Sequence, residues 1–374
     1  MQLVIDKSFL QTATSRLTGA ISERGLANIF LQASDRAEIS ASDMMFSVVS
    51  YFDSEVIRKG HCFVPAKLFC DIVKELPNGQ VKIFTDANFM TLLGGALDEF
   101  QMKIPLIDEV TAHEPAKYAP TQTSTLTTDQ LNYMIEQVQF SIQQNSTRNF
   151  GTVVKFHAPK SKLLRMVGCD GFRLSYCEVA GEELPKFLKE GVCLSKRCLQ
   201  ELARMGHEGF EQINISISDD KTTLIAQVPD YSIYMRLSSI DYPAYEKVFP
   251  EIKTEGVKFS RSYMLGVVRR VLLASDKNNA LSFEFEPNRL TVKSRNMGKF
   301  EGKEIIALED YNGGNTAISV NGKYVIEILN AMKSDDFKLY FVNSETPVLI
   351  KPIEEPKNCD SLHVLVPIED SAQA

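Results

Sequence analysis

Apolar residues recur along this chain with two different periods, and the alternation between them repeats three times. A helical spacing of three and four residues appears in three segments that each follow a short strand-like stretch, at residues 7–17, 127–142 and 260–275. A second helical pattern follows in each repeat, at residues 65–76, 195–205 and 321–333. The pattern predicts three copies of one unit, each with two amphipathic helices.

The spacing between the two helices of each copy supports the repeat. Their starts are separated by 58, 68 and 61 residues, counted from residues 7 to 65, 127 to 195 and 260 to 321. Pairs of β-rich segments around short polar turns accompany the helices and predict antiparallel hairpins. These pairs are residues 81–85 with 89–93, 212–218 with 222–227, 281–286 with 289–294, and 337–342 with 347–351.

The repeat predicts an α+β fold of three domains, each with two helices packed on antiparallel sheet. A length of 374 residues is sufficient for three domains of ordinary size. We expect the domains to span residues 1–120, 121–252 and 253–374, because the stretches near both boundaries are rich in proline and polar residues.

Charge is distributed unevenly between the helices and the rest of the chain. The chain has a net charge of −7, yet the six predicted helices contain 12 basic and 6 acidic residues. If the helices share one surface, that surface attracts a polyanion while the remainder repels it. The alternative is that lysine and arginine simply occupy solvated helix faces, and composition alone leaves both interpretations open.

The sequence offers little that would support catalysis, a cofactor or a metal. It has seven cysteines without a CxxC pair, five scattered histidines, and no GxxxxGK[ST], GxSxG or HExxH pattern. There is no apolar run long enough to cross a membrane and no visible secretory leader, so we expect a cytoplasmic protein.

Four segments together resemble the DNA polymerase III beta subunit family, the bacterial replicative DNA sliding clamps. VGCDGFRL at residues 167–174 is similar to the family's ATDGHRL, and DYPAYEKVFP at 241–250 is similar to its FPDYxxVxP. VPAKLFCDIVKELP at 64–77 and VNGKYVIEILNAMK at 320–333 resemble the second helices of its first and third domains. The resemblance implies a non-catalytic processivity factor that forms a head-to-tail homodimeric ring, with helices lining the hole, and encircles double-stranded DNA.

The resemblance also implies specific contacts with DNA. The positions that match the family's DNA-contacting residues are Arg24, Lys67, Arg148, Phe150, Lys196 and Arg197. Around Arg24 the sequence departs from the family, because a shorter loop without its two prolines replaces the usual stretch.

Partner proteins of this family insert short peptides into a pocket between the second and third domains. The matching positions are Gly151, Cys169, Gly171, Phe172, Arg173, Leu174, Pro243, Lys247, Val248, Val364, Leu365, Val366, Pro367 and Ile368. We expect Leu174, Val248, Val364 and Val366 to form an apolar socket. We also expect Arg173 and Lys247 to donate hydrogen bonds at its rim.

The pocket differs from the family in several positions. Phe172 replaces a histidine, Cys169 a threonine, Lys247 an arginine, and Gly151 a larger apolar residue. The chain also continues beyond its terminal valine-proline-isoleucine as an acidic segment, residues 369–374. These departures predict an altered peptide preference.

The resemblance places contacts between two copies at Phe100 and Met102 in the first domain and at Leu272 and Leu273 in the third. The alternative is that these four residues belong to the domain cores. Expected partners are the catalytic subunit of DNA polymerase III, the clamp loader, and repair and replication proteins with a clamp-binding motif. Two other functions stay open: a diverged clamp paralogue with a non-replicative tethering role, and an enzyme acting on nucleic acid, for which no clustered site is visible.

Overall fold

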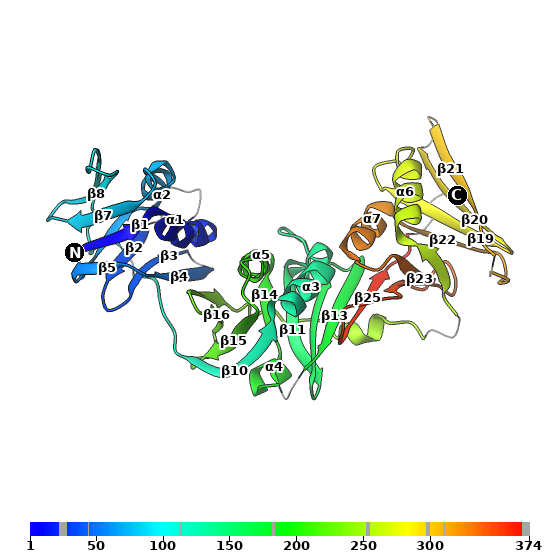
Figure 1. Cartoon of the computed structure of the whole chain (residues 1–374). Helices are drawn as coiled ribbons and strands as arrows, with labels where there is room; N and C mark the ends of the chain where they lie inside the picture. The colour runs from blue at the N-terminus through cyan, green and yellow to red at the C-terminus, as the bar shows by residue number, and fades with distance from the viewer. Residues whose placement is uncertain are drawn as a thin grey trace. The chain divides into compact units, whose positions relative to one another are not determined.

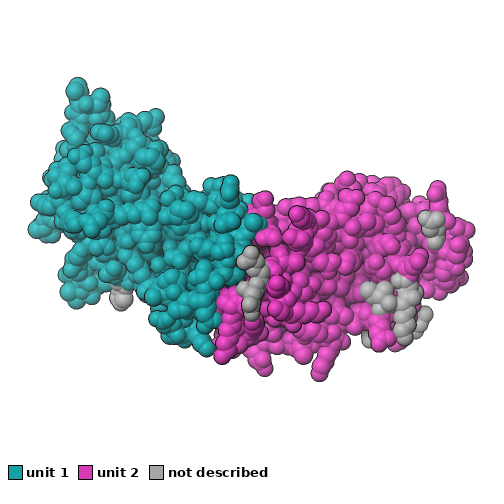
Figure 2. Space-filling model, turned by 60° about the horizontal axis from the view of Figure 1, so that its bottom comes forward, with its two compact units in different colours: residues 1–128, 200–237 teal, residues 129–199, 238–374 magenta. Residues whose placement is uncertain are grey.

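The computed structural model describes residues 1–21, 28–43, 45–112, 114–181, 184–251, 255–296, 300–309 and 311–368. Its elements are labelled in Figure 1. The chain packs into two compact units, coloured separately in Figure 2. The first comprises residues 1–128 and 200–237, and the second comprises residues 129–199 and 238–374.

The first unit contains two antiparallel sheets. One has five strands in the order β5-β1-β7-β8-β9, namely Glu55–Arg58, Gln2–Asp6, Gln80–Thr85, Phe89–Gly94 and Phe100–Pro105. The other has eight strands in the order β10-β15-β16-β17-β4-β3-β2-β6, namely Pro120–Thr127, Gln212–Ser218, Thr223–Val228, Tyr231–Arg236, Phe46–Phe52, Ala37–Ser42, Asn28–Ala33 and Gly60–Pro65. The ladder between β17 and β4 joins strands that are far apart in sequence into one sheet.

Helices α1 (Lys7–Arg16) and α2 (Ala66–Glu75) pack against each other in the first unit. The side chain of Asp6 accepts a hydrogen bond of 2.8 Å from the backbone of Ser8, which satisfies one of the free donors at the start of α1. Each helix buries one apolar face, with Leu10 and Phe69 fully inaccessible to solvent. The opposite faces are mostly polar, but Phe9 on α1 and Leu68 on α2 are 54% and 43% exposed.

The second unit also contains two antiparallel sheets. Its eight-stranded sheet runs β14-β11-β12-β13-β25-β24-β23-β18, namely Val192–Ser195, Val153–Lys160, Leu163–Cys169, Arg173–Ala180, Cys359–Leu365, Val348–Pro352, Asp336–Tyr340 and Val257–Ser260. Its four-stranded sheet runs β21-β20-β19-β22, namely Phe300–Ala307, Arg289–Asn296, Ala280–Glu286 and Thr316–Asn321. The β13–β25 ladder joins the central and C-terminal parts of the chain.

Helix α6 (Arg261–Leu272) packs on α7 (Gly322–Ala331) and on the four-stranded sheet, as Figure 1 shows. Helix α3 (Thr128–Val138) continues into a 3-10 turn, Gln139–Ser141, and α5 (Lys196–Gly206) follows β14. Four short elements complete the described chain: α4 (Lys186–Glu190) and the 3-10 turns η1 (Thr18–Ala20), η3 (Asn149–Thr152) and η4 (Tyr245–Val248).

The predicted α+β class is confirmed, and each of the six predicted helices lies within a few residues of its observed position. The four predicted hairpins correspond to β7–β8, β15–β16, β19–β20 and β23–β24. The short helix α4 was not predicted. The compact units do not follow the three-part repeat, because the β4–β17 and β13–β25 ladders each connect neighbouring repeats. The domain boundaries therefore stay a prediction.

Candidate nucleic-acid and partner-binding sites

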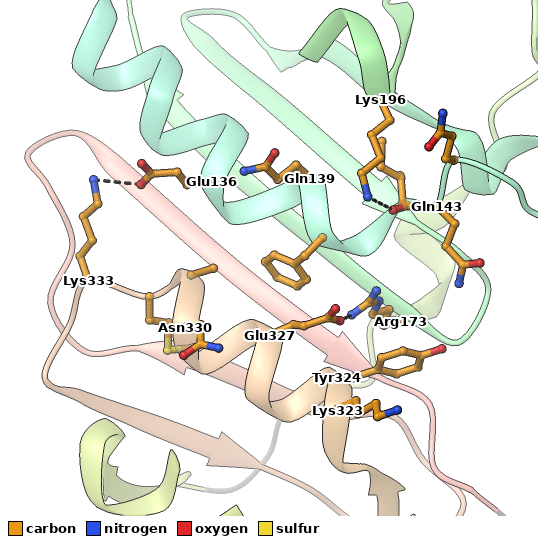
Figure 3. Close-up of a pocket in the computed structure, with 15 residues that line it drawn as sticks. Glu136, Gln139, Gln143, Arg173, Lys196, Lys323, Tyr324, Glu327, Asn330 and Lys333 are labelled. Atoms are coloured by element: carbon orange, nitrogen blue, oxygen red, sulfur yellow. Dashed lines mark hydrogen bonds and ion pairs between the residues drawn. The ribbon is translucent and has the colours of Figure 1, made fainter. Parts of the chain in front are cut away.

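A groove of about 920 Å³ lies in the second unit between α3 and α7, and we call it the α3–α7 groove. Figure 3 shows side chains from both helices pointing toward it. Its lining combines amides with charged and aromatic groups. The amides are Gln139, Gln143, Gln144 and Asn330, and the cations are Arg173, Lys196, Lys323 and Lys333. Amides and cations without a base-reading helix suit contacts with phosphate groups.

Ion pairs neutralise part of this positive charge. Lys333 contacts Glu136 at 2.9 Å at one end of the groove. Lys196 donates a 3.0 Å hydrogen bond to the carbonyl of Ile142, and its pKa is lowered by burial and then by the nearby Arg173. Lys323 is exposed and makes no ion pair with any residue that the structure describes. Lys196 and Lys323 are therefore the cations most available to a phosphate.

Arg173 makes several contacts within the protein. Its side chain is only 5% exposed, donates to Asp170 at 3.1 Å and contacts Glu327 on α7. The guanidinium carbon also lies 5.5 Å from the ring centre of Phe140 and 4.1 Å from that of Tyr324. These contacts use the Nε and one Nη1 donor of Arg173. Its expected role as a donor to a bound peptide stays a prediction.

The other predicted DNA-contacting residues lie on several elements. Lys67 is exposed on α2 beside a cavity of about 250 Å³ that α1 and α2 line together. Arg148 is exposed, Phe150 is half-buried against the core beneath β12 and β13, and Arg197 is half-buried on α5. Arg24 lies outside the described residues.

Several helix cations that entered the charge count are engaged within the protein. Arg16 is buried, pairs with Glu208 at 2.8 Å and lies over the ring of Tyr231. Arg261 donates to the carbonyl of Ser334, and Arg270 pairs with Glu304 at 2.7 Å. Arg16 therefore does not lie on a solvated helix face, as the alternative interpretation of the charge pattern assumed. The helices also offer fewer cations to a polyanion than the count of 12 basic residues implied.

The predicted partner pocket begins on one face of the β13–β25 ladder. Leu174 lies opposite Val364, and both are buried in the same apolar cluster. One step further along, the backbone nitrogen of Val366 donates to the carbonyl of Phe172 at 2.9 Å. Phe172 is 55% exposed and Val366 is 40% exposed. The two buried residues therefore form a floor, and the two exposed ones form an open apolar rim.

Two buried tyrosines belong to the same apolar cluster as Leu174 and Val364. The hydroxyl of Tyr242 donates to the carbonyl of Val167 at 3.0 Å. The hydroxyl of Tyr245 lies 2.8 Å from both His157 and Arg165. The segment they anchor carries the half-buried Pro243, the exposed Lys247 and Val248, of which the last is 38% exposed.

Packing explains the remaining pocket positions. Gly171 has φ +91°, and an added Cβ there would lie 1.5 Å from a guanidinium nitrogen of Arg148. A Cβ at Gly151 would lie 2.6 Å from the hydroxyl of Ser146, so the space of a larger residue is already filled. Cys169 is buried, which raises the pKa of its thiol.

The end of the described chain is held beside the pocket. Leu365 is buried in the apolar cluster that includes residues of α6 and α7. Pro367 and Ile368 are half-buried, and the backbone of Ile368 donates to the carbonyl of Ser319 at 2.7 Å. The acidic segment 369–374 lies outside the described residues.

The predicted dimer contacts lie on or near strand edges. Phe100 and Met102 are on β9, the edge strand of its sheet, and Met102 is 38% exposed. Leu272 packs partly against the core, whereas Leu273 is 82% exposed. Met102 and Leu273 are therefore not core residues, which was the alternative to a role in the contact between two copies.

Sequence reasoning missed three residues. Lys323 and Tyr324 line the groove, and Ile305 is 53% exposed on the edge strand β21. The motif at residues 320–333 could have indicated the first two, because they follow the start of its helix. Ile305 carried no such signal, since its exposure depends on which strand ends the sheet.

No group of three His, Cys, Asp or Glu side chains suited to a metal ion occurs among the described residues. Within the same residues, each helix is too short or too polar to span a bilayer.

Three family models match consecutive parts of the chain. They describe the N-terminal, central and C-terminal domains of the DNA polymerase III beta subunit, and they match residues 1–110, 125–244 and 246–369.

Curated relatives match over nearly the whole chain. The beta sliding clamp of Synechocystis sp. is 25% identical over 393 residues, covering 94% of this chain and 96% of the relative. That of Haemophilus influenzae is 24% identical over 382 residues, covering 98% and 100%.

Solved structures agree in fold. The DNA polymerase III beta subunit of Pseudomonas aeruginosa has a TM-score of 0.89 at 20% identity, covering 98% of this chain and 100% of that one. The C. crescentus beta sliding clamp has a TM-score of 0.88 at 21% identity, covering 99% and 100%.

Proposed function

The chain belongs to the DNA polymerase III beta subunit family, the non-catalytic DNA sliding clamps, and from this premise we propose how its surfaces serve that function. Two copies close head to tail into a ring around double-stranded DNA in the cytoplasm. The ring then tethers the catalytic subunit of DNA polymerase III, and it also receives the clamp loader and repair proteins that carry a clamp-binding motif.

The proposed contact with DNA rests on the α3–α7 groove. A clamp that slides must attract phosphates without holding any base pair tightly. The groove offers Lys196 and Lys323 among neutral amides, while Glu136 and Glu327 limit its net charge. We assign Lys67 and Arg197 to the same role on their own helices. Such a lining gives weak, salt-dependent attraction and leaves retention on DNA to the closed ring.

Ring closure would use the two strand edges. Strand β9 ends one sheet with Met102 exposed, and β21 ends another with Ile305 exposed. Unpaired edges can add a strand from another chain. The exposed Leu273 lies just beyond α6, which packs on β21, and adds apolar surface to that edge. Head-to-tail pairing of β9 with β21 covers both edges in each copy.

Partner peptides would bind the apolar face formed by Phe172, Val366 and Val248 above the Leu174–Val364 floor. An apolar anchor such as leucine or phenylalanine fits a site whose floor is dry and whose rim is open. Lys247 would supply a donor at the rim. Arg173 supports the site from beneath through its ion pairs.

Topological retention tests the function directly. The protein is loaded onto a nicked circular plasmid by a clamp loader with ATP, and bound protein is followed by gel filtration in 0.5 M salt. We expect the protein to stay on circles and to leave after the plasmid is cut once. Equal loss from circular and linear DNA would contradict encirclement. Retention without binding of a clamp-binding peptide would favour the diverged paralogue.

A further inference from the structure

The guanidinium of Arg148 lies against an exposed ring at the rim of the partner pocket. Its central carbon is 5.2 Å from the ring centre of Phe172, whose side chain is 55% exposed. Gly171 makes room for this contact, because a Cβ at that position would lie 1.5 Å from a guanidinium nitrogen of Arg148. The backbone of Arg148 is also held, since its amide donates to the hydroxyl of Ser146 and its carbonyl accepts from the amide of Gly151. The cation therefore has a defined position beside Phe172.

Arg148 has no counter-charge among the residues that the structure describes. Its exposed side chain makes no ion pair there, although Asp170 lies close by in the sequence of the same turn. One oxygen of Asp170 accepts from the backbone amides of Phe172 and Arg173, and the other accepts from the Arg173 side chain. A guanidinium that rests on a ring face keeps its N–H groups at the edge, where a planar carboxylate can accept two hydrogen bonds at once. Arg148 is thus available to a carboxylate from another molecule.

The position of Arg148 favours a bound peptide over a DNA phosphate as its ligand. Arg148 is not one of the residues that line the α3–α7 groove. It lies instead against Phe172, whose carbonyl accepts a hydrogen bond from Val366 two residues along the strands from the buried Leu174–Val364 pair. An extended peptide advances about 3.3–3.6 Å per residue, so a carboxylate one or two residues from an apolar anchor on that floor reaches this rim.

We propose that Arg148 determines which partners bind the pocket, an inference that rests on the proposed partner pocket. The guanidinium donates to a carboxylate of the bound peptide while an apolar anchor covers the Leu174–Val364 floor. The carboxylate is either an acidic side chain next to the anchor or the free end of a peptide that terminates there. A peptide without it gains only from apolar burial, so the pocket discriminates among partners by charge as well as by shape.

The test titrates three peptides against four proteins at low salt. The neutral peptide is Gln-Ala-Asn-Leu-Phe with an amidated end, the second has Asp in place of Asn, and the third has a free terminal carboxylate. Each carries an uncharged fluorophore at its N-terminus. The proteins are the parent, Arg148→Gln, Arg148→Lys and Lys162→Gln. The last is the matched control, because Lys162 is exposed, makes no ion pair with a described residue and precedes β12 at the end far from the pocket.

With the parent, we expect at least one of the two carboxylate peptides to bind about 3- to 10-fold more tightly than the neutral peptide, because it adds a charge-assisted contact. Comparison of the two peptides distinguishes an acidic side chain from a terminal carboxylate. The gain should fall below about twofold in Arg148→Gln, and it should be unchanged in Lys162→Gln. Arg148→Lys should retain part of it, since the charge stays but the planar fork is lost.

Two results would overturn the inference and leave the pocket in place. In the first, the neutral peptide binds the parent, but neither carboxylate increases the affinity or the increase survives in Arg148→Gln. In the second, Arg148→Gln leaves all peptide affinities unchanged and lowers the slope of log K against log salt concentration for a linear duplex by about 1, which would assign Arg148 to a phosphate. If none of the peptides binds the parent, the pocket itself is wrong and the inference fails with it.

Discussion

The guanidinium of Arg173 contacts the carboxylate of Glu327 and so connects the first residue of β13 with helix α7. The same guanidinium pairs with Asp170, which is 2% exposed and also accepts hydrogen bonds from the backbone of Phe172 and Arg173. One buried cation thus joins the start of β13 to one wall of the α3–α7 groove.

Replacing Arg173 with alanine should destabilise the protein rather than merely weaken peptide binding. Asp170 would keep its charge in a buried site without its cation, a loss of roughly 3–5 kcal/mol. Urea unfolding followed by circular dichroism measures this change. Glu327→Gln is the matched control and should cost at most about 1 kcal/mol, because its carboxylate is 47% exposed. Equal stability of Arg173→Ala and the parent would contradict the buried-pair interpretation.

His157 should make the protein sensitive to acid. Burial, and then Lys155 and Arg165 beside it, lower the pKa of His157 to about 4. The hydroxyl of Tyr245 accepts a hydrogen bond from Arg165 and can donate to a neutral His157, whereas a protonated ring would add a second donor and a like charge.

Because the pKa in the folded protein is below the unfolded value of about 6.5, protonation favours unfolding. The stability from neutral His157 is complete above pH 6.5 and is lost as the pH falls toward 4, by roughly 3 kcal/mol. Urea midpoints measured between pH 7 and 4 should fall less steeply in His157→Gln. A variant whose midpoints kept the parent's slope would show that His157 does not titrate in this range.

The sequence predicted the repeat well and individual side-chain roles less well. Helical and alternating periods depend on neighbouring residues, so the six helices and the hairpins followed from local pattern. The role of Arg173 depends on Glu327, which lies 154 residues away, and no local pattern indicates that pairing. Leu365 matches a pocket position of the family and is buried in the apolar cluster that includes residues of α6 and α7. The sequence singled out Phe172 because the family has a histidine at this position. The structure adds that the Phe172 side chain is exposed to solvent.

The cations of the α3–α7 groove should set the salt dependence of DNA binding. Lys196→Gln and Lys323→Gln should each weaken binding of a linear duplex at low salt. Each should also lower the slope of log K against log salt concentration by about 1 if the side chain contacts a phosphate. Fluorescence anisotropy at several salt concentrations gives both values. Arg270→Gln removes an equal charge that already pairs with Glu304, so it should leave the slope within error of the parent. A slope lowered equally by all three variants would indicate only a general charge effect.

Leu273→Asp should convert the dimer to a monomer. The side chain is 82% exposed in the single chain, so an aspartate there costs the monomer little. In the proposed ring the same position is apolar contact surface, where an unpaired carboxylate would be desolvated at a cost of several kcal/mol. Sedimentation velocity at micromolar concentration should show a single species of half the parent's mass, with unchanged circular dichroism.

A matched exposed site gives the control for that substitution. Val342 is 52% exposed after β23, outside the β9 and β21 edges, and Val342→Asp should leave the dimer intact. Met102→Asp on β9 should dissociate the ring as Leu273→Asp does, because head-to-tail closure pairs different surfaces of the two copies. Mixing the two monomeric variants should give an open heterodimer and no closed ring, since one joint pairs two unsubstituted surfaces and the other contains both aspartates. A Leu273→Asp protein that sediments as a dimer would place the subunit interface elsewhere.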